Sequence, residues 1–120
     1  MLKGFVNSRG EPIVRIALLS STNLSRSYSA VIDTGFNGTL SLPEPLIQRL
    51  GWRWIGHELY EIATGDVVRE KVFVGRVRWM RQLQEVDVVA SHAKDILIGT
   101  RLLEDHRISI DFRKRHVRIS

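Results

Sequence analysis

The sequence predicts an all-β fold, a barrel or sandwich with one or two short helices. Short apolar alternations recur along the 120 residues and are interrupted by Gly, Asn, Ser and Pro. This pattern is typical of chains that build many short strands joined by turns. No linker, low-complexity tract or helical repeat divides the chain, so we expect a single domain over residues 1–120.

The first half of the chain is expected to contain strands and one helix. The expected elements are a hairpin of Phe5 and Ile13–Leu19 around a turn at 7–10, a surface loop at Ser20–Ser29, a strand ending at Asp33, a strand at Thr39–Leu42 and a helix after Pro43. Pro45 suits the first helical turn, and Leu46, Ile47 and Leu50 share one face. Gly51 is placed to end the helix.

The second half is expected to continue the pattern of short strands. Its expected elements are a hairpin of Glu58–Ala63 and Val67–Val74 around Thr64-Gly65-Asp66, strands at Gln84–Ala90 and Ile96–Ile98, a helical stub at Thr100–Asp105, and a closing pair at Arg107–Phe112 and His116–Ile119. Each strand segment is bounded by Gly, Asn, Asp or Ser, or by a cluster of charged residues, which are common at turns.

Composition limits the classes of function. The chain has no Cys and carries a net charge of +5, with the excess of Arg concentrated at 76–81 and 113–118. We interpret these cations as part of a solvated face. No apolar stretch suits a signal peptide or a membrane span, so a soluble cytoplasmic protein without membrane contact is expected. The four His lack metal-ligand spacing and no phosphate-binding Gly loop occurs, so we expect no metal and no cofactor.

The stretch Ala30–Asn37 is the most informative part of the sequence. Small apolar residues lead into Asp33 like a buried strand, and Gly35 permits a backbone path that is closed to residues with a Cβ. The Thr34 hydroxyl can bond to neighbouring backbone groups. We therefore expect Asp33 to be held in a fixed position at the end of a strand.

The sequence resembles the retropepsin-like aspartic proteases. The active-site loop of that family, two apolar residues followed by Asp-Thr/Ser-Gly, is matched by Val31-Ile32-Asp33-Thr34-Gly35. Its second signature, an apolar run that ends in Gly before a short helix, is matched by Ile96–Gly99. The hairpin around Thr64–Asp66 lies where the family carries the flap that covers the substrate. The resemblance implies a single-lobe acid protease β-barrel, and Asp-Thr-Gly-Phe-Asn-Gly is similar to the small bacterial and archaeal branch.

One carboxylate cannot perform the chemistry of this family alone. Two carboxylates about 3 Å apart share one proton, so one can accept a proton from water while the other donates one to the scissile carbonyl. This chain has a single Asp-Thr-Gly and room for a single lobe. The resemblance therefore implies an aspartic endopeptidase that acts on a peptide or unfolded protein as a twofold homodimer, with Asp33 of each subunit on the axis.

The resemblance also implies roles for individual residues. Asp33 would activate water, Thr34 would bond across the axis, and Gly35 would let the substrate backbone approach. The residues expected to contact substrate are Val31, Phe36, Asn37, Ala63, Thr64, Gly65, Asp66, Leu97 and Ile98. Several have a simpler structural interpretation, because Thr34 can cap its own turn, Thr64–Asp66 can be an ordinary hairpin turn, and Val31, Leu97 and Ile98 can be core residues.

Three departures from the retroviral pattern alter the expected site. Phe36 stands in place of the usual Ala and changes the shape of the pocket beside the aspartates. Asn37 and Gly38 replace an acidic pair. Thr100-Arg101 replaces the Arg-Asn pair, so the tie between Arg and Asp that stiffens the retroviral dimer is missing or shifted by one residue.

Two other classes of function remain open from the sequence. One is a dimeric peptide-binding module that kept the fold and lost turnover, which crowding by Phe36 would permit. The other, which we regard as the weaker, is a basic β-barrel that binds single-stranded nucleic acid through Arg and aromatic residues. Trp52 and Trp54, two apart on a strand, would share one face for stacking, and Trp79 is the third candidate.

Overall fold

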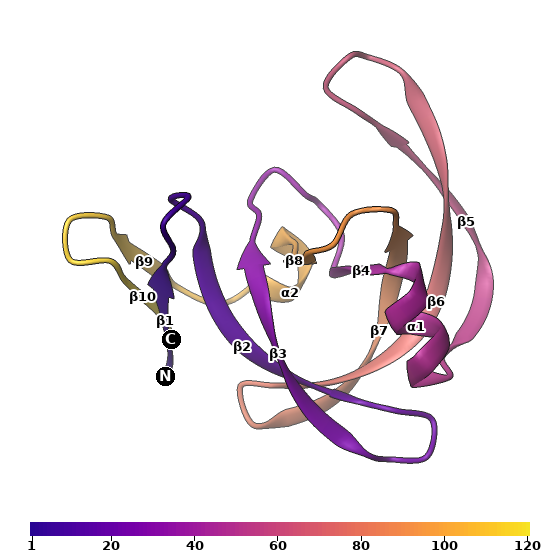
Figure 1. Cartoon of the computed structure of the whole chain (residues 1–120), viewed down its shortest axis with the longest axis horizontal. Coiled ribbons are helices and arrows are strands. Elements are labelled where there is room, and N and C mark those ends of the chain that lie inside the picture. The colour runs from indigo at the N-terminus through magenta and orange to yellow at the C-terminus, as the bar shows by residue number, and fades with distance from the viewer.

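The computed structural model describes all 120 residues, and its strands form one sheet that curves into a barrel (Figure 1). The strands are β1 (Leu2–Val6), β2 (Pro12–Leu19), β3 (Ser25–Ile32), β4 (Leu40–Pro43), β5 (Arg53–Glu61), β6 (Val67–Trp79), β7 (Gln82–Ser91), β8 (Ile96–Ile98), β9 (Ile108–Asp111) and β10 (His116–Ile119). The helices are α1 (Glu44–Leu50) and α2 (Thr100–Leu103).

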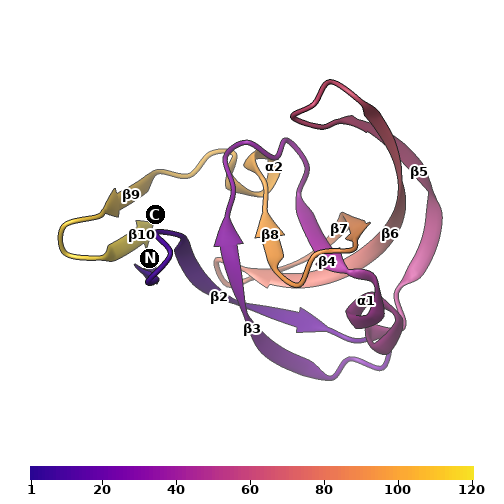
Figure 2. The ribbon, with the colours of Figure 1, turned by 45° about the horizontal axis from the view of Figure 1, so that its top comes forward.

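Six of the ten strands close the barrel. The strand order is β5-β6-β7-β4-β8-β3-β2-β1-β10-β9, and β6 also pairs with β2, so that the run from β6 to β2 forms a ring. The pairs β3–β8 and β4–β7 are parallel and the others are antiparallel. Outside the ring, the β5–β6 hairpin extends on one side and the ribbon of β1, β10 and β9 on the other (Figures 1 and 2). This all-β barrel with two short helices confirms the predicted fold class.

The core fills the ring with the inward-facing side chains of its strands. A cluster of 23 buried residues includes Leu18, Leu40 and Ile98, each with no exposed surface. Helix α1 covers part of this core with its apolar face, as its spacing predicts, and ends at Gly51, whose φ of 72° is left-handed. No helix in the structure is both long enough and apolar enough to span a membrane.

The expected loop at Ser20–Ser29 is wrong in its second half. Strand β3 begins at Ser25 and pairs with β2 in register from Leu19 opposite Ser25. Its first residues are polar because that part of β3 is exposed, and only from Tyr28 onward do alternate side chains turn inward. Because successive residues at the start of β3 are all exposed to solvent, they show no apolar alternation, and the sequence gives no signal for a strand there. The other expected elements are present, with ends shifted by a few residues.

Candidate active site

Asp33 directly follows β3, and its backbone and side chain are both held in place. The Asp33 amide donates to the Ile98 carbonyl at 2.9 Å, which continues the pairing of β3 with β8. The Asp33 Oδ1 atom accepts from the Gly35 amide at 2.9 Å, and the Phe36 amide donates to the Asp33 carbonyl at 3.1 Å. The turn therefore fixes a partly exposed carboxylate at the end of a buried strand.

The segment after β8 holds this loop from the other side. Helix α2 has no side-chain cap at its N-terminus, and carbonyl groups of the β3–β4 loop accept from its first amides instead. The bonds run from Gly99 to Thr39 (3.0 Å), from Thr100 to Phe36 (2.9 Å) and from Arg101 to Gly38 (3.1 Å). Two segments far apart in the sequence thus form one hydrogen-bonded corner, which we call the loop–α2 corner (residues 33–39 and 99–101).

Gly99 is required for the close approach within this corner. Gly99 is buried, and a Cβ there would overlap the Gly38 carbonyl oxygen and lie 2.7 Å from the Phe36 ring. The Gly at the end of the second apolar run is therefore needed for packing against the first loop and not for a left-handed φ.

The β5–β6 hairpin curves over the end of the barrel where the β3–β4 loop lies (Figures 1 and 2). Its tip is closed by bonds between Ile62 and Asp66 and between Gly65 and Ile62, each 2.9 Å, and by a bond of 3.1 Å from Thr64 Oγ1 to Asp66 Oδ2. Gly65 has a φ of 88°. The hairpin is longer than the sequence predicts.

Tyr60 joins this hairpin to the loop that carries Asp33. The Tyr60 ring lies 6.2 Å from the Phe36 ring, centroid to centroid and tilted, and its hydroxyl donates to Glu58 Oε2 at 2.6 Å. Burial, and then the hydrogen bond to Glu58, raise the pKa of Tyr60 above its ordinary value. Tyr60 therefore remains protonated as a hydrogen-bond donor over the physiological pH range.

A cavity of about 270 Å³ lies between the hairpin, β7 and the corner. Its lining includes Asn37, Glu58, Tyr60, Asp87 and Arg101. No motif in the sequence assigns Glu58, Tyr60 or Asp87 to the site. Glu58 and Tyr60 are two apart on one face of β5, which is the only signal the sequence offers, whereas Asp87 comes from a distant strand.

Arg101 does not reproduce the tie of retroviral enzymes. The ion pairs within the chain are Arg9 with Glu11 and Lys71 with Glu44. Arg101 lines the cavity instead, and its amide donates to the Gly38 carbonyl. The expected tie is therefore absent within the subunit rather than shifted.

The structure brings only part of the expected site together. Asp33 to Asn37 form one loop, and Ala63 to Asp66 form the exposed hairpin tip. Val31 and Leu97 pair in register and are half-buried on the face opposite the core. Ile98 is completely buried, so its expected contact with substrate is wrong, because it points into the barrel as a core residue.

The expected aromatic face is also wrong. Trp52 is buried just before β5, where its indole Nε1 donates to the Leu19 carbonyl at 2.8 Å, while Trp54 is 54% exposed. Trp79 is buried as well, and its indole donates to His106 Nε2 at 3.3 Å. Trp52 lies in the core before β5 begins at Arg53, and this position separates it from Trp54, which the sequence places on the same face.

Comparison with known proteins supports the fold. No protein-family model matches the sequence, and no curated protein matches it. A similar solved structure is that of a retropepsin-like aspartic protease from Rickettsia conorii, which has a TM-score of 0.69 and 18% sequence identity over 96% of this chain and 86% of that one. The chain therefore has a retropepsin-like fold.

Proposed function

We propose that this protein is an aspartic endopeptidase that is active as a twofold homodimer. The observation that carries the proposal is the fixed position of Asp33, whose side chain is held by the Gly35 amide and whose loop is held by α2. The Asp33 carboxylates of two subunits would share a proton across the axis and activate one water molecule for attack on a peptide bond.

The other residues of the loop would assist this chemistry. The exposed Thr34 hydroxyl would bond across the axis and keep the two carboxylates coplanar. Gly35, also exposed, would let the substrate backbone approach. Phe36, Asn37 and the tip residues 63–66 would line the cleft, with Tyr60, Glu58 and Arg101 at its side. The substrate would be a peptide or an unfolded protein, and a cytoplasmic location remains our prediction.

The dimer would need a free edge or face near the chain ends. Strand β10 pairs with β1 on one side and β9 on the other, so both of its edges are occupied. Strand β9 is the last strand of the sheet and keeps one free edge. Of the two strands nearest the C-terminus, β9 (Ile108–Asp111) is therefore the one that can pair with a second subunit.

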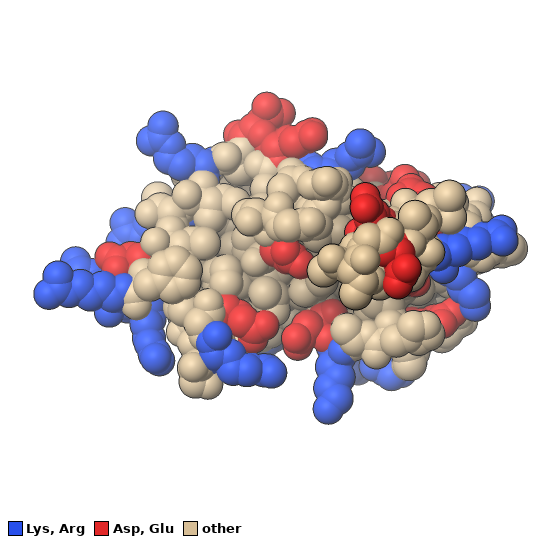
Figure 3. All heavy atoms as spheres, turned by 90° about the horizontal axis from the view of Figure 1, so that it is seen from above, with Lys and Arg blue, Asp and Glu red and all other residues tan.

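A catalytically silent peptide-binding dimer is the second candidate. It is favoured by the contact between Phe36 and Tyr60, which narrows the space beside Asp33. Nucleic-acid binding is less favoured, because Trp52 and Trp79 are buried. In addition, the face that carries the hairpin tip has Lys and Arg at its margins and Asp and Glu nearer the middle (Figure 3), which is no continuous basic patch.

The test combines the molecular mass of the protein in solution, which gives its oligomeric state, with a measurement of how it cleaves an unfolded substrate protein between about pH 4 and 6. We expect a dimer, a bell-shaped pH profile and inhibition by a statine-type compound. Asp33→Asn should lower cleavage about a thousandfold or more, whereas Asp105→Asn, on an exposed turn, should leave it unchanged. Peptide binding without cleavage by the unaltered protein would favour the silent dimer.

A further inference from the structure

A second groove lies between β3 and α1, away from Asp33. Its volume is about 870 Å³, and its lining comes from β3, β4, α1, the end of β7 and the segment 92–96. None of the lining residues belongs to the loop at 33–39 or to the β5–β6 hairpin. Tyr28 in the groove is five residues from Asp33 along β3, which corresponds to roughly 17 Å.

The wall formed by β3 is an open sheet edge. Strand β8 pairs with β3 only through Ala30–Ile32, so the residues of β3 before Ala30 have no neighbour on this side. Two bonds at the ends of β3 show which way its backbone groups point. Just before β3, the Leu24 carbonyl points toward β2 and accepts from the Ser20 amide. Just after β3, the Asp33 amide points toward β8 and donates to the Ile98 carbonyl. Because backbone groups alternate in direction along a strand, even-numbered residues of β3 bond to β2 and odd-numbered residues face the groove.

The open edge offers mainly hydrogen-bond donors. By this alternation the amides of Ser27 and Ser29 point toward the open edge. Ser29 lines the groove, and Ser27 lies between Arg26 and Tyr28, which line its extension. The Ser27 carbonyl already accepts from the Arg15 guanidinium at 3.1 Å. Ser91, at the end of β7, adds a buried hydroxyl without a hydrogen-bond partner to the lining of the same groove. The groove is therefore suited to a ligand that supplies acceptors.

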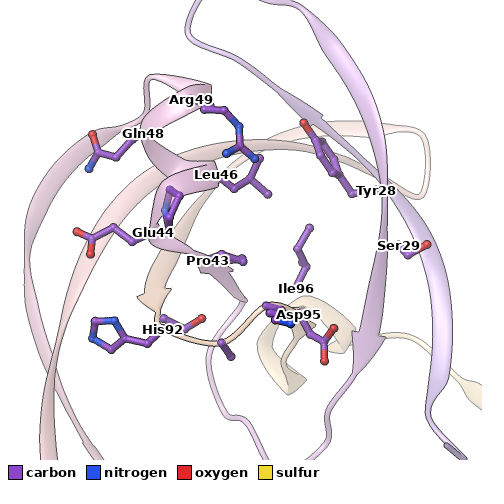
Figure 4. Close-up of a pocket in the computed structure, with 14 residues that line it drawn as sticks. Tyr28, Ser29, Pro43, Glu44, Leu46, Gln48, Arg49, His92, Asp95 and Ile96 are labelled. Atoms are coloured by element: carbon purple, nitrogen blue, oxygen red, sulfur yellow. The ribbon is translucent and has the colours of Figure 1, made fainter.

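The side chains of the groove add an apolar surface and a cation. Tyr28, Leu46 and Ile96 point into the same space, and the Arg49 guanidinium bends over it (Figure 4). Glu44 points away from this space and is paired with Lys71 at 2.9 Å. Lys94 and Asp95 also line the groove. A hollow of about 260 Å³ shares Tyr28, Leu46 and Arg49 with the groove and extends it along β3.

Positive charge exceeds negative charge along this combined surface. Arg26 and Arg49 line the extension, which contains no carboxylate, and Glu44 in the main groove is already neutralised by its ion pair. The positive charge of Lys94 offsets the negative charge of Asp95, which is the other carboxylate of the groove. The surface is thus complementary to an acidic ligand that also has apolar groups.

We propose that the groove between β3 and α1 binds an extended acidic peptide segment, which adds a strand to the open edge of β3. Its carbonyl groups accept from the Ser27 and Ser29 amides, an apolar side chain covers Tyr28, Leu46 and Ile96, and a carboxylate binds Arg49. Backbone pairing supplies affinity in this mode, and the side-chain contacts supply specificity. The site does not need Asp33 and is separate from the proposed catalytic cleft.

The test uses a short dye-labelled peptide of alternating glutamate and valine, bound to the 120-residue chain with the Asp33→Asn substitution and followed by fluorescence anisotropy. Arg49→Glu should weaken binding roughly tenfold or more, because a charge-assisted bond is replaced by repulsion. Arg113→Glu, on the exposed turn between β9 and β10, makes the same change in net charge and should alter binding less than about twofold. A peptide of alternating lysine and valine should bind at least about tenfold more weakly.

A second pair of variants isolates the edge itself. Ser27→Pro removes the amide donor that faces the groove, while Ser27→Ala keeps it, so only Ser27→Pro should weaken binding. Circular dichroism checks that each variant is folded. Hydrogen exchange provides the site-resolved measurement, because binding should slow exchange of the Ser27 and Ser29 amides.

Three results would overturn the proposal. The first is equal weakening by Arg49→Glu and Arg113→Glu, which would indicate binding to net charge alone. The second is protection of the β5–β6 hairpin without protection of Ser27 and Ser29. The third is concentration-dependent protection of these two amides without peptide, which would show that a second copy of the chain covers the edge. None of these results depends on turnover by Asp33, so they leave the proposed protease activity untouched.

Discussion

The loop–α2 corner and the tip of the β5–β6 hairpin both carry residues of the proposed site, but they are held in different ways. In the corner, three backbone bonds join residues 36–39 to residues 99–101, and Gly99 is buried against Gly38. At the tip, the bonds connect Ile62 to Asp66 and its near neighbours only, and residues 63–66 are all exposed.

This difference is the one that the proposed function requires between a fixed catalytic loop and a cover that opens. A segment fixed by long-range bonds and buried contacts opens only with much of the fold, whereas a tip with local bonds opens at low cost. A carboxylate pair needs a fixed geometry, and a cover must open to admit a polypeptide. Single substitutions that remove one contact of the corner or of the hairpin test this difference.

The largest effect is expected at Gly99. Gly99→Ala places a Cβ where the Gly38 carbonyl lies, so the corner must move. We expect a loss of about 3 kcal/mol in the free energy of unfolding, together with loss of cleavage. Denaturant unfolding measures the first quantity. A change below about 1 kcal/mol would show that the corner is not tightly packed.

Phe36→Ala tests the link between the corner and the hairpin. The Phe36 ring is partly buried and packs near Tyr60, so its removal should cost about 2 kcal/mol. The space beside Asp33 should widen, and cleavage should shift toward sites with larger side chains. Mass spectrometry of the products of an unfolded protein checks this shift. An unchanged set of cleavage sites would place Phe36 outside the substrate pocket.

Gly65→Ala tests the hairpin tip. The left-handed φ of Gly65 disfavours a Cβ, but no atom lies nearby, so the stability cost should be roughly 1 kcal/mol. Gly10→Ala is a matched control, because Gly10 has a φ of 80° and the same open surroundings in the turn between β1 and β2. Stability should fall equally in both variants, but cleavage should fall further in Gly65→Ala. Equal cleavage would argue against a covering role.

Together with Gly65→Ala, the smallest change in stability is expected from loss of the Tyr60 hydroxyl. Because the pKa of Tyr60 is raised in the folded chain, the protonated hydroxyl contributes stability below the ordinary pKa of 10.0, and this is lost as the pH rises beyond it. Tyr60→Phe should cost roughly 1 kcal/mol at neutral pH and remove the late step from the absorbance titration of tyrosinate. A late step that persists in this variant would contradict the assignment.

The sequence predicts most of this fold because its signals are local. Alternating apolar residues, the turn at 64–66 and the stop at Gly51 each act within a few residues. The start of β3 escaped prediction because exposed polar strand residues do not differ in type from loop residues, and only pairing with β2 reveals them.

The candidate site was predictable where it lies in one loop and not where it is assembled from several strands. Asp33 to Gly35 are contiguous, so their motif can be recognised directly in the sequence. The cavity of Glu58, Tyr60, Asp87 and Arg101 joins β5, β7 and α2, and the burial of Ile98 depends on which face of β8 turns inward. Long-range pairing decides both, and residue types alone do not specify it.

The central claim is that each active site uses Asp33 from two subunits. It is tested most directly by unfolding the unaltered protein together with an equal amount of Asp33→Asn protein, refolding the mixture, and measuring cleavage. If both carboxylates are needed, only dimers of two unaltered subunits work, and activity should be about one quarter of that of the unaltered protein at the same total concentration. A value of about one half would mean that each subunit acts alone and would contradict the account.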